Sequence, residues 1–97
     1  MTDDFMQSPE FQALIKEYLE YLQQSLPGVR TNLQDELYQD VYKFGHNIKG
    51  TGTSYGFQEL SDYGRDICEA VKAEEYSKLA GLLDVVGTVI DKGLAEQ

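Results

Sequence analysis

Apolar residues recur at steps of three and four in four successive segments of this 97-residue chain. That spacing places them along one face of an α-helix, which completes a turn in about 3.6 residues. The sequence shows no sustained alternation of apolar and polar residues, the pattern of a half-buried strand. Connections of a few residues make consecutive helices antiparallel neighbours. The sequence therefore predicts an all-α fold, an antiparallel up-down-up-down four-helix bundle, in a single domain over residues 1–97.

The first helix is expected over residues 9–26, after a short polar N-terminal arm at residues 1–7. Ser8 can cap its first turn, and the proline that follows suits the first helical position. Its apolar stripe continues until a Pro-Gly pair, which ordinarily stops a helix. The stripe consists of Phe11, Leu14, Ile15, Tyr18, Leu19, Leu22 and Leu26.

The second helix is expected over residues 32–55, because Thr31 and Gln34 have the spacing of a capping box. Gly56 is placed to adopt the left-handed conformation that commonly follows a helix. The stripe of this helix is formed by Leu33, Leu37, Val41, Phe44 and Ile48. Two further helices complete the bundle, over residues 58–72 and 76–94.

Composition restricts the class of protein. Apolar residues make up 41% and charged residues 26% of the chain, which is typical of a globular domain. No run approaches the ~20 apolar residues of a membrane span, and the acidic N-terminus is unlike a signal peptide, so we expect a cytoplasmic protein. Cys68 is the single cysteine, which rules out an internal disulfide and agrees with a reducing compartment. The formal net charge of −9 disfavours nucleic acid and anionic membrane as partners.

His46, the single histidine of the chain, lies in the second predicted helix and points away from its apolar stripe. At ~100° per residue the stripe centres near ~40°, and His46 falls at ~220°. The imidazole is therefore expected to face solvent. Gln39 and Thr53 lie within ~20° of it on this helical wheel, and Tyr42 and Gly50 lie within ~40°.

Two lysines, Lys43 and Lys49, flank His46 at three residues before and after it. They form a locally positive patch on an acidic protein. Neighbouring ammonium groups disfavour the cationic imidazole, which leaves more of the neutral, nucleophilic ring at neutral pH. The same charges would stabilise a phosphoryl group on the ring.

Three glycines, Gly45, Gly50 and Gly52, fall within the same predicted helix, where each costs about 1 kcal/mol relative to alanine. Gly50 lies one turn beyond His46 on nearly the same face and clears space above the ring. Gly45 and Gly52 lie nearer the apolar stripe, which predicts close packing against another helix. Taken singly, an exposed histidine, solvated lysines or packing glycines would be ordinary, and their combination at these spacings is what indicates a site.

The pattern His46-x-x-Lys49-Gly50, with Gly56 ten residues after the histidine, resembles the histidine-containing phosphotransfer (HPt) domain of bacterial two-component phosphorelays. The apolar Ile48 before the lysine and the small residues between the glycines fit the same family pattern. The resemblance covers nearly the whole chain, because that family is also a four-helix bundle.

This resemblance implies that His46 carries a phosphoryl group on its outer ring nitrogen and that Lys49 stabilises the phosphoryl charge. The group would pass to or from an aspartate of a response-regulator receiver domain, and a sensor histidine kinase, often a hybrid one, would be a further partner. The chain would be a monomeric phosphocarrier rather than an enzyme, with no cofactor of its own, because the receiver supplies the Mg²⁺. The receiver would dock on the face formed by Lys43, Gly50, Tyr42, Gln39 and Thr53.

Two positions depart from the family pattern. Gly45 stands where alanine is common before the histidine. Cys68 stands where some members have a glutamine that hydrogen-bonds the ring, and a thiol is a poor substitute. The ring is then oriented either by a different group, for which Arg65 and Glu69 are nearby candidates, or by none.

Other functions fit the sequence less well. The glycine-rich run after His46 has neither the spacing nor the preceding strand of a nucleotide-binding loop. One histidine and one cysteine are too few ligands for zinc, and the Glu-x-x-His pairs of a carboxylate-bridged metal bundle are missing. Two alternatives stay open. One is a non-phosphorylated helical adaptor that docks a receiver or kinase through the same face, and the other is the excised phosphotransfer part of a larger kinase.

Overall fold

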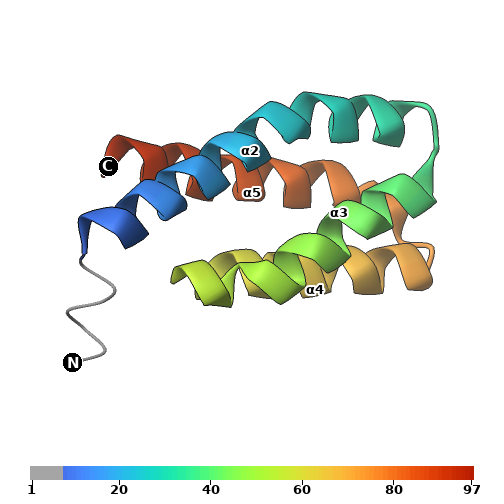
Figure 1. Ribbon diagram of the computed structural model, residues 1–97. Helices are drawn as coiled ribbons and strands as arrows, with labels where there is room; N and C mark the ends of the chain where they lie inside the picture. The colour runs from blue at the N-terminus through green and yellow to red at the C-terminus, as the bar shows by residue number, and fades with distance from the viewer. Residues whose placement is uncertain (1–7) are drawn as a thin grey trace.

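Four α-helices run in alternating directions along the bundle in the computed structural model, which describes residues 8–97 (Figure 1). The N-terminal arm predicted at residues 1–7 lies outside the described residues. No strand occurs within residues 8–97, so the predicted all-α four-helix bundle is confirmed. The elements in chain order are α2 (Pro9–Gln34), α3 (Tyr38–Thr51), the 3-10 turn η1 (Thr53–Tyr55), α4 (Gln58–Lys72), the 3-10 turn η2 (Tyr76–Lys78) and α5 (Leu79–Ala95).

Each helix packs against two neighbours, with α2 beside α3 and α5, and α4 beside α3 and α5. The contact between α3 and α4 is the most extensive of these, and in Figure 1 the two helices lie side by side below α2 and α5. The core fills the space between the four helices, because the apolar stripe of each one faces inward. Its most deeply buried large side chains are Leu19, Leu22, Val41, Ile48, Leu60, Ile67, Leu79, Leu83, Val86 and Ile90.

The first helix does not end before Pro27, as predicted, but continues to Gln34. A proline removes one helical hydrogen bond, and the carbonyl that loses its partner here belongs to Gln23, which is exposed to water. Val29 is buried beyond the proline, and Arg30 pairs with Asp84 of α5 at 2.7 Å between Nη1 and Oδ1. These tertiary contacts lie beyond Pro27 and favour continuation of the helix past it.

The end of α2 is formed without the glycine that usually marks such an end. Glu36 adopts a left-handed φ of 60°. The N–H of Leu37 then donates to the carbonyl of Asn32 at 2.8 Å, and the N–H of Glu36 donates to the carbonyl of Leu33 at 3.0 Å. This pair of bonds is the Schellman motif, which satisfies carbonyls that the helix leaves open.

The second helix therefore begins at Tyr38, and the capping box predicted at Thr31 and Gln34 is wrong. The Thr31 hydroxyl lies within α2, where it donates to the carbonyl of Pro27 at 3.2 Å. Two residues assigned to apolar stripes, Leu14 and Leu37, are each 48% exposed.

The second helix also ends earlier than predicted, at Thr51 rather than residue 55, and passes into η1. Gly56 has a φ of 88° and is the left-handed residue that the sequence predicted. The bounds predicted for the third helix, residues 58–72, match α4. The fourth predicted helix, residues 76–94, divides into η2 and the longer α5.

Candidate functional site

His46 lies on α3 with its side chain exposed, on the side of the helix away from the core. The buried residues of the same helix are Val41, Gly45 and Ile48, at three- and four-residue steps. Because the helix buries that face against the bundle, residues two positions from Ile48 or five from Val41 are turned outward. The structure thus presents the imidazole to solvent on a helix whose opposite face is fixed in the core.

The support beneath His46 is a close contact between the backbones of α3 and α4. A Cβ added at Gly64 of α4 would lie 2.5 Å from the carbonyl oxygen of Gly45 and 2.6 Å from the amide nitrogen of Lys49. A Cβ added at Gly45 would lie 2.7 Å from a side-chain carbon of Ile67. Side chains at the two glycine positions would separate the helices, so the two glycines are what allow α3 to sit directly on α4.

Gly50, one turn beyond His46, has the opposite surroundings. It is exposed, and nothing lies within 4 Å of a Cβ built at this position. The surface next to the imidazole is therefore open to an approaching group.

The two predicted lysines are both exposed and lie on opposite sides of His46. Lys43 borders a cleft of about 250 Å³ between α2 and α3, together with Tyr21 and Asn47. Lys49 lies toward α4, where its charge acts on the thiol of Cys68. The imidazole is thus bracketed by positive charge from both flanks.

A third lysine joins this patch from another helix. Lys72 stands in the last turn of α4, and its ammonium nitrogen lies 5.8 Å from the centre of the Tyr42 ring. Sequence reasoning missed it, because Lys72 is 26 residues from His46 and approaches only through the packing of α4 on α3.

The ring of Tyr42 lies parallel to the imidazole of His46. The two ring centres are 6.2 Å apart and the planes differ by 9°. The pair sits one turn apart on α3, where residues four apart share a face. Of the predicted site residues, Tyr42 is the one with a ring contact to His46.

Thr53 is placed less centrally than the helical wheel predicted, whereas Gln39 stays on the helix of His46. Thr53 lies beyond the end of α3, in η1, and its hydroxyl hydrogen-bonds to Gln58 and Ser61 at 3.1 and 2.8 Å. It therefore ties η1 to α4 instead of extending the helical face of His46. Gln39 is exposed in the first turn of α3, two turns from His46.

Cys68 does not take the place of the ring-binding glutamine. The residue is 4% exposed, and its thiol donates to the backbone carbonyl of Tyr42 at 3.8 Å. Burial raises the pKa of the Cys68 thiol, an effect that the charges of Lys49 and Lys72 partly offset.

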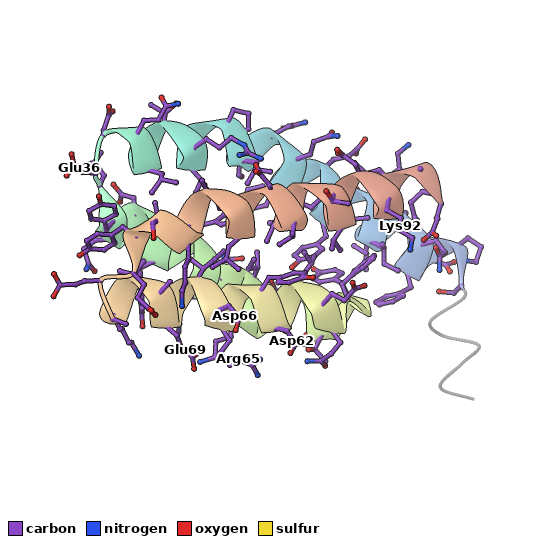
Figure 2. The ribbon with its side chains drawn as sticks, turned by 180° about the vertical axis from the view of Figure 1, so that it is seen from behind. Glu36, Asp62, Arg65, Asp66, Glu69 and Lys92 are labelled. Atoms are coloured by element: carbon purple, nitrogen blue, oxygen red, sulfur yellow. The ribbon has the colours of Figure 1, made fainter. Side chains whose placement is uncertain are left out.

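The two candidates named for orienting the ring are engaged elsewhere. Arg65 pairs with Asp62 at 3.9 Å and with Asp66 at 3.8 Å, all on α4. Glu69 lines the groove between α4 and α5. Figure 2 shows all four side chains along the outer side of α4.

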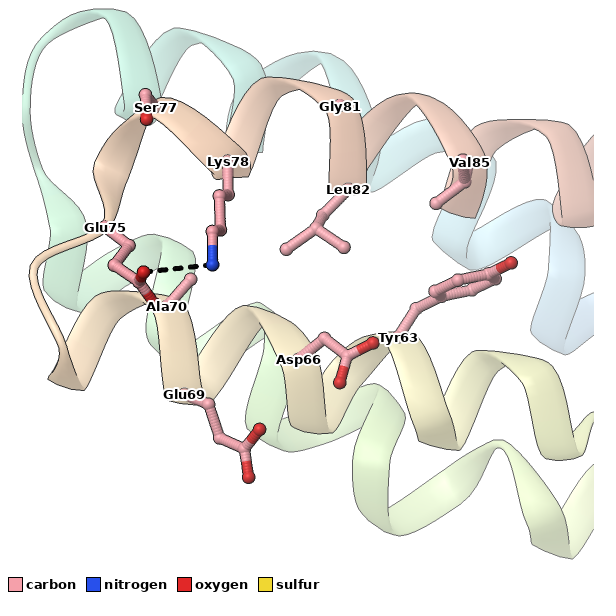
Figure 3. A pocket seen from close by; sticks show the side chains of 10 residues that line it. All are labelled: Tyr63, Asp66, Glu69, Ala70, Glu75, Ser77, Lys78, Gly81, Leu82 and Val85. Carbon is pink, nitrogen blue, oxygen red and sulfur yellow. Dashed lines mark ion pairs between the residues drawn. The ribbon is translucent and has the colours of Figure 1, made fainter.

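A groove of about 600 Å³ lies between α4 and α5 (Figure 3). Leu82 and Val85 of α5 project into it, and Glu75 pairs with Lys78 at 3.0 Å at one end. Three carboxylates line it against one ammonium group. That charge balance opposes binding of a phosphate, so phosphoryl chemistry favours the α3 face over this groove. The groove is lined by Tyr63, Asp66, Glu69, Ala70, Glu75, Ser77, Lys78, Gly81, Leu82 and Val85.

Residues 8–97 contain neither a membrane-spanning helix nor a cluster of metal-binding side chains. None of the helices within residues 8–97 combines the length and the apolar character needed to cross a bilayer. Over the same residues, no three side chains of His, Cys, Asp or Glu gather as they would around a metal ion.

Comparison with known proteins returns no match: no family model fits the chain, and no curated protein or solved structure is significantly similar to it. The class that the structure itself defines is an all-α four-helix bundle.

Proposed function

We propose that this chain is a phosphorelay intermediate, of the HPt kind, that carries a phosphoryl group on His46. The observation that supports this most directly is the exposed imidazole beside an open surface at Gly50, on a helix whose other face is buried. A histidine that served the core would be turned inward and hydrogen-bonded there. A surface reagent needs the reverse arrangement, with a fixed backbone and free space before the reacting nitrogen.

The transfer step requires few groups from the carrier protein itself. In the neutral ring, Nδ1 holds the proton and the lone pair on Nε2 attacks phosphorus of the aspartyl phosphate of a receiver domain. The new P–N bond forms as the P–O bond to the aspartate breaks, and the carboxylate leaves with that electron pair. Return of the phosphoryl group reverses the two bond changes. The receiver and its Mg²⁺ would stabilise the equatorial oxygens.

The lysines supply the charge that this exchange needs on the carrier side. The protein has a net charge of −9, and a receiver pocket built from carboxylates would be repelled by such a surface. Lys43 and Lys49 flank His46 along α3, and Lys72 of α4 lies beside the Tyr42 ring. Of these, Lys49 follows His46 by one turn, where its ammonium group can reach a phosphoryl oxygen on the ring.

The direct test is phosphorylation by a panel of phosphorylated receiver domains with Mg²⁺. We expect label on the wild-type protein that is stable to base and labile to acid, as phosphohistidine is. His46→Gln keeps a side chain of similar size without a nucleophilic nitrogen and should take up no label. Wild-type protein that stays unlabelled with every receiver, or a His46→Gln variant labelled like the wild type, would refute the proposal.

Measuring receiver binding alongside the labelling assay tests the alternative that the chain is a non-phosphorylated adaptor. An adaptor would bind a receiver with equal affinity in the wild type and in His46→Gln, and it would take up label in neither. A phosphocarrier would show label in the wild type alone.

The role of Gly50 can be tested with a matched pair of variants. Gly50→Gln should crowd the imidazole and slow transfer while the bundle stays folded. Gly28→Gln places the same side chain at an exposed glycine of α2, which also has nothing within 4 Å of a Cβ, and should leave transfer unchanged. Equal transfer rates in the two variants would show that the space beside His46 is not used.

A further inference from the structure

The two residues expected from sequence to orient the His46 imidazole, Arg65 and Glu69, lie against other partners. An exposed side chain samples several rotamers, and transfer proceeds from those that point the reacting nitrogen outward. Cys68 is buried and directed at a backbone carbonyl, and Arg65 is held by carboxylates of its own helix.

Tyr42 lies where such a group would act. Its ring plane is within 9° of the imidazole plane, with centres 6.2 Å apart, which falls in the range of an offset stack. A parallel neighbour on one side of the imidazole restricts rotation toward that side. Tyr42 itself is half-buried, so its own movement is limited.

Two residues of α4 contact Tyr42, one at its ring and one at its backbone carbonyl. The ammonium group of Lys72 lies 5.8 Å from its ring centre, within the distance of a cation–π interaction. The thiol of Cys68 donates to its backbone carbonyl at 3.8 Å. Both contacts come from the C-terminal half of α4, and of the two it is Lys72 that lies beside the Tyr42 ring, whereas Cys68 contacts the backbone that carries it.

We propose that Tyr42 is a positioning residue for the His46 imidazole and that Lys72 holds the Tyr42 ring in place. The consequence for transfer rests on the proposed phosphocarrier function, whereas the restriction of the ring is a property of the unphosphorylated protein. This role differs from docking, because it would affect His46 in the absence of any partner.

Because His46 is the single histidine, its imidazole signals can be followed by NMR without ambiguity. Tyr42→Leu removes the ring and keeps an apolar side chain. We expect the His46 ring protons to move toward free-imidazole values and the order parameter of the imidazole to fall. Tyr42→Phe keeps the ring and should behave as the wild type.

Matched controls separate this effect from general loosening of the bundle. Tyr63→Leu removes another partly buried tyrosine, at the α4/α5 groove, and should leave the His46 signals unchanged. Lys72→Leu should shift them in the same direction as Tyr42→Leu, by less. Lys92→Leu removes the corresponding last-turn lysine of α5 and should have no effect. Wild-type imidazole signals and order in Tyr42→Leu would overturn the proposal.

Transfer from two donors then distinguishes positioning from docking. Phosphoramidate is a small donor whose P–N bond breaks with ammonia leaving, and it needs no docking surface. If Tyr42 positions the ring, Tyr42→Leu should slow phosphorylation by phosphoramidate and by a phosphorylated receiver alike, by about three- to ten-fold, the size expected for immobilising one side chain.

A rate that falls only with the receiver would make Tyr42 a docking residue and overturn the positioning role. Wild-type protein that neither donor phosphorylates would count against the proposed function alone, since the NMR comparison would still decide whether Tyr42 orders the ring.

Discussion

The two sides of α3 differ in how much room a side chain has. On the inner side, Gly45 and the facing Gly64 of α4 lie so close that a methyl group at either would meet atoms at less than 3 Å. On the outer side, Gly50 has no atom within 4 Å of a Cβ position. In one helix, glycine therefore occurs both at a close contact with the neighbouring helix and at a position with free space around it.

The residues of α3 that stabilise the fold and those that could carry chemistry therefore lie on opposite sides of one short helix. The residues that set the distance of α3 from α4, and its rotation about its own axis, face α4. The residues that could react or accept a partner face solvent. Substitutions on the inner side should change the free energy of unfolding, and those on the outer side should change reactivity.

The largest effect is expected at Ile48, which is 0% exposed and fills the core between the helices. Ile48→Ala should lower the free energy of unfolding by about 3–4 kcal/mol, the usual cost of emptying such a site. His46→Ala, two residues away on the outer side, should change it by no more than about 0.5 kcal/mol. Chemical denaturation of both variants measures the contrast, and losses of equal size would show that His46 also serves the core.

The next effect is expected at the helix contact itself. Gly64→Ala places a methyl group against backbone atoms of α3, which cannot move aside as a flexible side chain would. We expect a loss of about 2 kcal/mol, because the strain of overpacking exceeds the gain in helix propensity. Gly81→Ala is the control, since this α5 glycine has nothing within 4 Å, and it should be neutral or stabilising. A thermally stabilised Gly64→Ala protein would contradict the close contact.

Much of this division could be predicted from sequence. The period of the apolar residues placed Val41 and Ile48 inside and His46 outside, and the helical wheel assigned Gly45 to packing and Gly50 to the open face. These inferences depend on one helix at a time. They held although the helix is shorter than predicted, because rotation about its axis is set by the residues within it.

What could not be predicted depends on contacts between helices or on unusual backbone. Pro27 was expected to end α2, but Arg30 reaches Asp84 of α5 beyond it, and no local pattern encodes that pair. Glu36 supplies a left-handed residue where glycine or asparagine would have marked the helix end. The contact of Lys72 with the Tyr42 ring was missed because it depends on how α4 packs on α3.

A smaller effect is expected at Tyr18, which joins α2 to the end of α3. Its hydroxyl hydrogen-bonds to Oγ1 of Thr51 at 2.7 Å, and its ring stacks on Tyr55 with centres 4.1 Å apart. Tyr18→Phe keeps the stack and removes the hydrogen bond, so we expect a loss of about 1 kcal/mol at neutral pH.

The same variant carries a pH signature. Burial raises the pKa of Tyr18 above its usual value of 10.0, and the hydrogen bond to Thr51 partly offsets this. The folded state therefore binds the Tyr18 hydroxyl proton more tightly than the unfolded state does. The contribution of this hydroxyl to the free energy of unfolding is complete below pH 10, and it is lost as pH rises through the folded-state pKa. Denaturation midpoints should fall less steeply above pH 10 in Tyr18→Phe than in the wild type. Parallel pH profiles would show that the hydroxyl is not desolvated.

The smallest effect on stability, and the one that tests the division most sharply, is expected at Gly50. Gly50→Ala adds one methyl group to open space near the end of α3, so helix propensity alone should act and raise the free energy of unfolding by about 0.5 kcal/mol. Gly45→Ala makes the same change five residues earlier on the inner side and should be destabilising, because Ile67 lies 2.7 Å from the new carbon. If both variants lost stability, Gly50 would belong to the packing of the bundle. Opposite signs in one helix would show that Gly50 lies outside the packing of the bundle and is retained at a cost in stability, as expected of a residue that keeps the surface beside His46 open.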